Sequence, residues 1–334
     1  MKNDNQIFRS FDVFAMTVCS TIGVGLAFLP FVSGEEIRSA WLKVIVAALP
    51  YFILIYFIHL FVKKYSSQNF FLEMKQSLPK IVFLLIVAYY FFSSLYSGVI
   101  VIKGMNTIIE TYLLPQSPHW LNISSFLLVV GVALYYGIAA ITRFIVFFVI
   151  FEFVILAMLV LIIFSDYFRW IYIPPIVNVD LATFAISSLS DMNRFAGVVV
   201  LLAFVSHVKP RENMFRSMSL GLSFVLAVYV VLCITAVGTF GYEEAFVLLS
   251  PFIALIQTYG GEAGLIERMD LLFVAFWIIA FFKMIMVHIW FIVFILRLTW
   301  PSVPPIRWIV LFNSLLFILI LLLEDFTNKS WRPY

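Results

Sequence analysis

Nine long apolar segments dominate this sequence of 334 residues. Hydrophobic residues make up 64% of the chain and charged residues only 12%, whereas a soluble domain is about half apolar and about a quarter charged. A helix needs about 20 apolar residues to cross a bilayer. The segments run roughly over 11–33, 40–62, 80–114, 120–139, 141–165, 182–208, 214–240, 268–298 and 305–323. The sequence therefore predicts an all-α integral membrane protein with about nine transmembrane helices in one polytopic domain, 1–334.

The charges between these segments alternate in sign along the chain. Every second loop is rich in Lys and Arg, and the loops between them are acidic. The basic residues are Lys63, Lys64, Lys75, Lys80, Arg143, Lys209, Arg211, Arg216, Arg297 and Arg307, and the acidic ones are Glu35, Glu36, Asp166, Asp180, Glu243, Glu244, Glu262 and Glu267. Cytoplasmic loops carry an excess of Lys and Arg. We therefore expect a cytoplasmic N-terminus and, with nine spans, an exterior C-terminus.

The first apolar segment contains residues that disfavour a continuous helix. Gly23 and Gly25 lie near its centre, and Pro30 follows seven residues after the first of them. Glycine is the poorest helix former after proline. One interpretation is a broken membrane helix, as in secondary transporters, whose free amides and carbonyls bind a ligand near the midplane. The other is that the glycines let a neighbouring helix approach closely.

The sixth segment also has an irregular composition. Within residues 187–198 it carries Asp191, Arg194 and Gly197 in what would otherwise be an apolar helix. Two interrupted spans that lie five segments apart are typical of an inverted repeat of five plus five helices. The repeats would cover about 8–165 and 182–323, the second without its last helix. Alternatively, the sixth helix begins near Phe195, and the two charged residues lie in an exterior loop.

Ionisable residues at membrane depth are candidates for function. Glu152 falls near the middle of the fifth segment, and Lys283, in the eighth, would neutralise it if the two met. Lys103 either extends along its helix to a lipid headgroup or is buried. Arg194 of the sixth segment is a further candidate.

Enzyme chemistry has no recognisable motif here. The sequence contains no nucleophile elbow, paired-histidine metal motif, phosphate-binding loop or dinucleotide fingerprint. Cys19 and Cys233 fall inside apolar segments and indicate neither a disulfide framework nor a metal site. The basic residues follow the topology and form no patch with interleaved aromatic residues, so nucleic-acid binding is unsupported. We expect no enzyme activity, cofactor or metal.

Several motifs occur in an order that resembles a known family. They are Gly23-Val24-Gly25-Leu26 with Leu29-Pro30, Gly137 with Arg143, Phe195-Ala196-Gly197 with Lys209-Pro210-Arg211-Glu212, and Ile266-Glu267-Arg268-Met269-Asp270 with Trp277-Ile278-Ile279. This order is similar to that of the spore germination B subunits, which are permease-like proteins of the amino acid–polyamine–organocation superfamily. The chain departs from the family pattern at Val199, where the family usually has glutamate, and in an apparently missing tenth helix.

The resemblance implies a broken-helix, inverted-repeat transporter fold (LeuT-like). It also implies a germinant-sensing subunit in the spore inner membrane, which binds a small nutrient such as an amino acid. The partners would be an A-type subunit and a lipoprotein C-type subunit of the same receptor. An amino acid permease of the same superfamily is the alternative function.

The resemblance implies a ligand site that combines the two interrupted spans with faces of helices three and eight. Its candidate residues are Thr21, Gly23, Gly25, Ser93, Ser97, Ala196, Gly197, Met284 and His288. Ser93 and Ser97 lie four residues apart, as do Met284 and His288, so each pair shares one helix face. The alternative for the serines is a hydrogen bond to a carbonyl one turn back. The Met284–His288 pair could simply contribute to packing.

Overall fold

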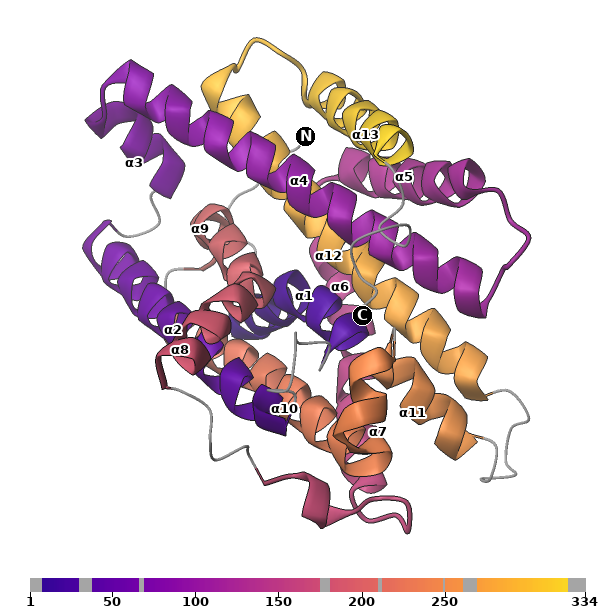
Figure 1. The fold of residues 1–334 in the computed structure, drawn as a ribbon. Coiled ribbons are helices and arrows are strands. Elements are labelled where there is room, and N and C mark those ends of the chain that lie inside the picture. The colour runs from indigo at the N-terminus through magenta and orange to yellow at the C-terminus, as the bar shows by residue number, and fades with distance from the viewer. Residues whose placement is uncertain are drawn as a thin grey trace. The chain divides into compact units, whose positions relative to one another are not determined.

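The computed structural model describes residues 8–29, 38–65, 69–174, 181–209, 212–248, 250–260 and 269–323. This part of the chain is helical except for connecting turns and a single bridge between Phe8 and Val208 (Figure 1). Judged by length and composition, eight of its helices can cross a membrane: 40–65, 80–112, 119–136, 138–162, 184–207, 214–245, 273–299 and 305–322. A ninth, shorter apolar helix lies in the first segment. Each predicted segment therefore contains one of these helices, which confirms an all-α membrane protein.

Proline, glycine and asparagine mark several helix boundaries. Pro118 precedes α5 (His119–Tyr136), and Gly137, with φ 83°, separates it from α6 (Ile138–Phe148). Glycine adopts this left-handed conformation without the clash that a Cβ atom would cause. The side chain of Asn69 accepts hydrogen bonds from two backbone amides at the start of α3 (Phe70–Ser77), which satisfies donors that a helix end leaves unpaired.

Contacts between Cα atoms divide the chain into two compact units. The described residues of the first unit are 69–141 and 285–323. Here α13 (Pro305–Leu322) packs against both α4 (Lys80–Tyr112) and α5. The side chain of Asn313 donates a hydrogen bond to the Leu127 carbonyl at 3.3 Å, and Gly98 of α4 lies against Leu316.

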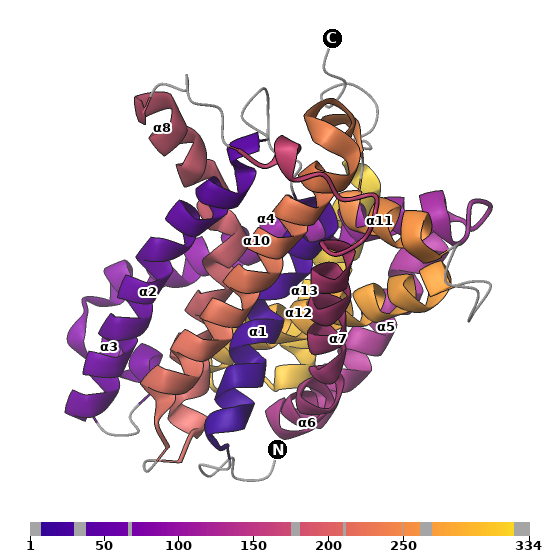
Figure 2. The same ribbon diagram turned by 90° about the horizontal axis from the view of Figure 1, so that it is seen from below.

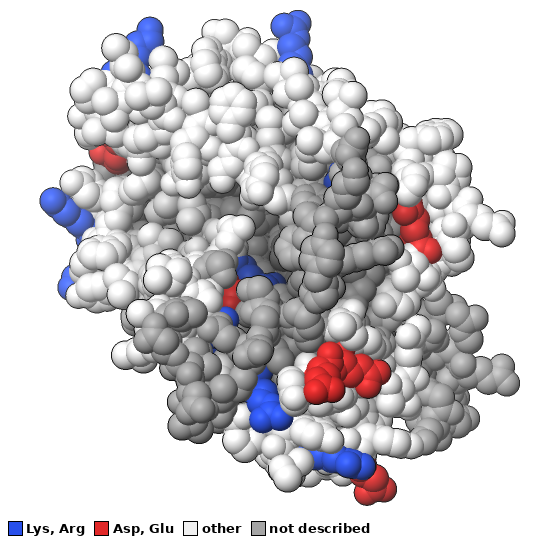
Figure 3. All heavy atoms as spheres, viewed as in Figure 1, with Lys and Arg blue, Asp and Glu red and all other residues white. Residues whose placement is uncertain are grey.

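One face of α4 is apolar and exposed. Its large side chains are Ile81, Leu85, Tyr89, Phe92 and Tyr96. Their spacing of three or four residues places them on one side of the helix, while Phe83, Val87 and Leu95 are buried. A soluble protein rarely exposes such an apolar stripe to water. The stripe is consistent with a helix face that contacts lipid. Charged side chains are also sparse over the described part of the face drawn in Figure 3.

The second unit contains the described residues of 8–65 and 142–284. Its centre is α10 (Met214–Val247), which contacts α1 (Ser10–Phe28), α2 (Ala40–Tyr65) and α7 (Ile150–Ile162). Figure 2 shows α1, α7 and α10 side by side. Gly241, with φ 76°, kinks α10 near its end. Two elements of this unit, η2 (Trp170–Tyr172) and α11 (Pro251–Gly260), lie in what the sequence suggested were loops.

The sixth segment is irregular, as predicted. It begins as α8 (Leu181–Asp191), changes to the 3₁₀ helix η3 (Met192–Val200), and ends in α9 (Leu201–Phe204) and η4 (Val205–His207). A 3₁₀ run of nine residues is unusual, because such helices seldom exceed four residues. The alternative of a helix that begins near Phe195 is wrong, since Asp191 and Arg194 both lie inside this helical span.

The first helix is not interrupted at Gly23 or Gly25, so that prediction is wrong, while Pro30 lies outside the described residues. The α-helix α1 continues through Gly23 and Gly25 and ends at Phe28. Glycine inside a helix costs only about 1 kcal/mol relative to alanine, which favourable packing can offset. The amides of Gly23 and Gly25 are therefore part of a continuous helix. The predicted division of the chain into two sequence repeats stays a prediction.

Candidate functional site

The structure divides the candidate ligand residues between the two units. The second unit contains Thr21, Gly23 and Gly25 on α1, Ala196 and Gly197 on η3, and Met284 on α12 (Met269–Thr299). Ser93, Ser97 and His288 belong to the first unit. Ser93 is exposed, whereas Ser97 and His288 are half-buried. A role for these three residues in ligand binding stays a prediction.

The backbones of α1 and η3 almost touch where they cross. A Cβ atom added to Gly197 would lie 1.8 Å from the carbonyl oxygen of Ser20. Backbone cannot move aside as a flexible side chain can, so only glycine fits at this crossing. The crossing thereby joins the irregular sixth segment to the middle of α1.

Two large side chains cover the glycines of α1. A Cβ atom on Gly25 would lie 2.1 Å from the ring of Tyr229, and one on Gly23 would lie 2.7 Å from the Met284 sulfur. The Tyr229 hydroxyl donates a hydrogen bond to the carbonyl oxygen of Thr21 at 2.7 Å. Close approach, the second interpretation of these glycines, is therefore confirmed. The sequence analysis missed Tyr229, because nothing marks one tyrosine in a long apolar segment.

The hydroxyl groups of α1 bond to their own helix. Thr21 donates to the Thr17 carbonyl at 2.9 Å, and Thr17 donates to the Val13 carbonyl at 2.7 Å. Such bonds satisfy a buried hydroxyl without a tertiary partner. The Thr21 side chain is thus bonded locally, while its carbonyl oxygen forms the tertiary contact with Tyr229.

An ion pair lies at the change from α8 to η3. Arg194 Nε is 3.0 Å from Asp191 Oδ1, and only 5% of the Asp191 side chain is exposed. The second carboxylate oxygen of Asp191 is buried and accepts no hydrogen bond from the described residues. A buried charge is tolerated only when it is paired. Asp191 and Arg194 therefore stabilise each other inside the span.

A second ion pair is buried completely. Lys283 of α12 contacts Glu152 of α7 through Nζ and Oε1, and each side chain is 1% exposed. The same ammonium group lies 3.4 Å from the carbonyl oxygen of Phe148. The two residues therefore do meet, and Lys283 neutralises Glu152. Its neighbour in the chain, Met284, is the residue that covers Gly23.

The start of α1 is tied to the chain that follows the sixth span. The backbone amide of Phe8 donates to the His207 carbonyl, and that of Lys209 donates to the Phe8 carbonyl. The Glu212 carboxylate accepts hydrogen bonds from the backbone amide of Ser10, at 2.9 Å, and from its hydroxyl. These two bonds, helped by the nearby basic residues, hold the pKa of Glu212 below its ordinary value.

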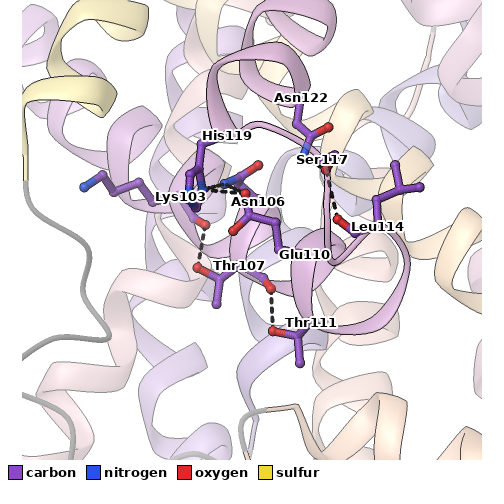
Figure 4. Close-up of polar contacts among 9 residues, drawn as sticks. All are labelled: Lys103, Asn106, Thr107, Glu110, Thr111, Leu114, Ser117, His119 and Asn122. Atoms are coloured by element: carbon purple, nitrogen blue, oxygen red, sulfur yellow. Dashed lines mark hydrogen bonds and ion pairs between the residues drawn. The ribbon is translucent and has the colours of Figure 1, made fainter.

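A separate polar cluster joins α4 and α5 in the first unit (Figure 4). Asn106 donates to Glu110 at 2.7 Å, and His119 Nδ1 lies 2.5 Å from Glu110 Oε1. Lys103 is buried and donates to the Leu323 carbonyl, so it does not extend along its helix to a lipid headgroup. Lys103, Asn106 and His119 also line a cavity of about 180 Å³.

Some predicted features lie outside the described residues, among them Glu267 and Arg268 of the Glu-Arg motif and Arg211 of the basic stretch. Across the described ranges, no group of three or more His, Cys, Asp or Glu residues could hold a metal ion. The arrangement around α1 and η3 is therefore one of close backbone packing, one tyrosine hydroxyl and two buried ion pairs.

Comparison with known proteins identifies similar sequences and folds. Residues 8–329 match the family described as spore germination protein. The chain is 26% identical, over 298 residues, to spore germination protein A2 of Bacillus subtilis (strain 168), with 85% of this chain and 77% of that protein covered. Its fold is similar to that of Mhp1, a nucleobase-cation-symport-1 family transporter solved in a closed conformation with bromovinylhydantoin bound. The TM-score is 0.69 at 13% identity, and the match covers 97% of this chain and 75% of the transporter.

Proposed function

Because this chain belongs to the spore germination protein family, we propose that it is the germinant-sensing membrane subunit of a spore germination receptor. Its ligand would be a small nutrient of the amino acid type. The observation that carries this proposal is the crossing of α1 and η3, where Gly197 lets two backbones meet and Tyr229 bonds to the Thr21 carbonyl.

The proposed ligand site is the glycine face of α1, which Tyr229 and Met284 cover in this conformation. A ligand would bind by displacing these two side chains. Its ammonium group would replace the Tyr229 hydroxyl as the donor to the Thr21 carbonyl oxygen. A charged donor forms a stronger hydrogen bond than a neutral hydroxyl, so this exchange favours an amine-bearing ligand over a neutral one.

Sensing requires only that the ligand stabilises one of two conformations. A ligand shifts such an equilibrium by as much as its affinities for the two states differ. Displacement of Tyr229 and Met284 from α1 separates a covered state from an open one. A difference of about 5.5 kcal/mol would convert an almost fully covered population into an almost fully open one.

We further propose that the protein lies in the spore inner membrane with a cytoplasmic N-terminus, beside A-type and C-type receptor subunits. Affinity isolation of the tagged protein from spore membranes should recover these subunits together with it. Recovery of the tagged protein without either subunit would argue against the receptor complex.

The second candidate function is an amino acid permease. The similarity of this chain's fold to that of a transporter favours this candidate. The deciding assay uses the purified full-length protein, reconstituted alone in liposomes, with radiolabelled L-alanine as the probe. A sensor should show no concentrative uptake when a proton or sodium gradient is imposed. Accumulation of L-alanine inside the vesicles would establish the permease instead.

Replacement of Gly25 tests the site itself. Gly25→Leu places a branched side chain against the Tyr229 ring and should abolish the germination response to amino acids. Gly131→Ala is the matched control, because its Cβ atom would meet only the amide nitrogen of Asn313, at 3.1 Å. Normal accumulation of Gly25→Leu protein with an unchanged concentration dependence would exclude α1 as the site.

A further inference from the structure

We propose that the cavity lined by α4, α5 and α13 in the first unit binds the head group of phosphatidylglycerol, an anionic phospholipid with hydroxyl groups. Its lining combines the polar side chains of Lys103, Asn106 and His119 with apolar ones such as Ile123 and Ile320. The cavity has a volume of about 180 Å³, whereas a single water molecule requires only about 10–15 Å³. All of these residues belong to the first unit, so this site is separate from the ligand site proposed on α1.

The cavity lies at one end of two membrane-spanning helices. The helix α5 begins at His119, and α13 ends at Leu322, between the lining residues Leu321 and Leu323. Each helix has 18 residues and is therefore about 27 Å long, close to the roughly 30 Å thickness of the hydrocarbon core. Their ends thus lie where the lipid head groups begin. A basic residue in a cavity between transmembrane helices favours an anionic head group.

Lys103 supplies the positive charge of the cavity. Its side chain is buried and contacts the Leu323 carbonyl oxygen, so Lys103 stays inside the protein and the head group has to enter the cavity. Phosphate oxygens accept strong, charge-assisted hydrogen bonds from an ammonium group. The carboxylate of this cluster, Glu110, is bound by Asn106 and His119 and is not among the described residues that line the cavity. The lining therefore favours an anion.

Asn106 has one hydrogen-bond acceptor without a donor. Its amide nitrogen donates to Glu110 Oε1 at 2.7 Å and lies 3.2 Å from His119 Nδ1 (Figure 4). Because a carboxylate only accepts hydrogen bonds, the nitrogen has to face Glu110, and the carbonyl oxygen is directed elsewhere. This oxygen, Oδ1, is buried and has no hydrogen-bond partner in the part of the chain that the structure describes. A buried acceptor without a donor is unfavourable, so a ligand that donates a hydrogen bond gains affinity here.

The cavity thus requires a ligand that carries both a negative charge and a hydrogen-bond donor. The phosphodiester of phosphatidylglycerol supplies the charge beside Lys103, and its glycerol hydroxyl groups supply donors for Asn106 Oδ1. Phosphatidylethanol has the same phosphodiester but no hydroxyl group. Phosphatidylcholine has neither a net charge nor a donor. An ammonium head group could also donate to Asn106, but the like charge of Lys103 disfavours it.

Native mass spectrometry of the full-length protein measures lipid binding directly. Protein released from detergent micelles is titrated with phosphatidylglycerol, phosphatidylethanol or phosphatidylcholine, all with the same acyl chains. Phosphatidylglycerol should bind about tenfold more tightly than phosphatidylcholine, the ratio that one hydrogen bond to a charged group supplies. It should bind about fivefold more tightly than phosphatidylethanol, the ratio for one neutral hydrogen bond.

Two variants separate the contributions of charge and donor. Lys103→Met should lower the affinity for phosphatidylglycerol to about that for phosphatidylcholine. Asn106→Leu should remove the preference over phosphatidylethanol. Thr107→Val is the matched control, because the Thr107 hydroxyl donates to the Lys103 carbonyl of its own helix at 3.1 Å, and this variant should retain the full preference. Thermal unfolding shows which variants are folded, and the lipid ranking of the native protein tests the proposal without any variant.

Equal affinities of the native protein for phosphatidylglycerol and phosphatidylcholine would overturn the proposal. A preference that survives unchanged in folded Lys103→Met and Asn106→Leu proteins would do the same. Glycerol phosphate in water distinguishes a lipid from a soluble phosphate ester: it should bind the detergent-solubilised protein far more weakly than the lipid does, and equally tight binding would show that the lipid assignment is wrong. These measurements do not involve the germination response, so their outcome is independent of the ligand site proposed on α1.

Discussion

The hydroxyl group of Tyr229 donates a hydrogen bond to the carbonyl oxygen of Thr21, and the ring of Tyr229 covers Gly25. The glycine of α1 is thus required by a side chain that comes from α10, about two hundred residues later in the chain. Tyr229 therefore closes the part of the α1 face around Gly25, within the surface that we propose as the ligand site.

Removal of the Tyr229 hydroxyl should weaken this closure. Tyr229→Phe keeps the ring and leaves the Thr21 carbonyl without its tertiary donor, which should cost about 1 kcal/mol of folding stability. Because a ligand no longer has to displace the hydroxyl, the germination response should shift to lower amino acid concentrations. Dose–response curves of spores that carry each protein measure the shift, and a shift to higher concentrations would contradict the proposed exchange.

The crossing at Gly197 should tolerate no side chain. Gly197→Ala forces the backbone of η3 away from Ser20, and we expect a loss of about 3 kcal/mol or more, at the upper end of overpacking effects. Gly131→Ala, whose Cβ atom would meet a movable side chain, should change stability far less. Thermal unfolding of both variants in detergent gives the comparison. Equal stability of the two would show that α1 and η3 can separate without loss.

Single and double replacement of Glu152 and Lys283 should change the free energy of unfolding by different amounts. Lys283→Met leaves a buried carboxylate without its partner, and such a loss typically costs about 3–5 kcal/mol. Glu152→Leu combined with Lys283→Met replaces the pair by apolar side chains and should recover most of that loss. A double-mutant cycle of unfolding free energies measures the coupling. Additive losses would mean that the two side chains do not interact.

The hydrogen bonds between Glu212 and Ser10 should depend on pH. The pKa of Glu212 is lowered in the folded protein, mainly by hydrogen bonds from the hydroxyl and the amide of Ser10. The stabilisation is therefore present above the ordinary glutamate pKa and is lost as the pH falls through the lowered folded value. Hydrogen exchange at the Ser10 amide, corrected for intrinsic rates, should accelerate over that acidic range. In the Glu212→Gln variant the Ser10 amide should exchange faster at neutral pH, and its exchange rate should no longer change over the acidic range.

The predicted topology can be tested with single cysteines at exposed positions between the spans. If the basic segment between the second and third spans is cytoplasmic, as predicted, a cysteine at Gln76 should be protected from an impermeant thiol reagent in intact cells. A cysteine at Asp166 should react, since the same topology places this acidic loop outside. The native Cys19 and Cys233 are buried and give little background. The opposite labelling pattern would reverse the orientation.

Local sequence determined the helices and their class. Runs of about 20 apolar residues can satisfy their backbone in a membrane only as helices or closed barrels, so the nine segments could be found without tertiary information. The irregular sixth span was also visible, because Asp191, Arg194 and Gly197 interrupt its apolar pattern. Lys283 could be named as a residue that would neutralise Glu152, but no sequence motif assigned the pair, and only the packing of α7 against α12 brought the two side chains together.

Tertiary packing decided what the glycines do. A glycine permits both a break and a close approach, and its own sequence cannot distinguish them, because the choice depends on which side chain arrives from elsewhere. Tyr229 and Met284 cover Gly25 and Gly23, and the Ser20 carbonyl meets Gly197. These contacts join residues far apart in the chain, and their favourable packing offsets the weak helix propensity of glycine. The sequence thus determined where the helices lie, and the packing between them decided that α1 stays continuous.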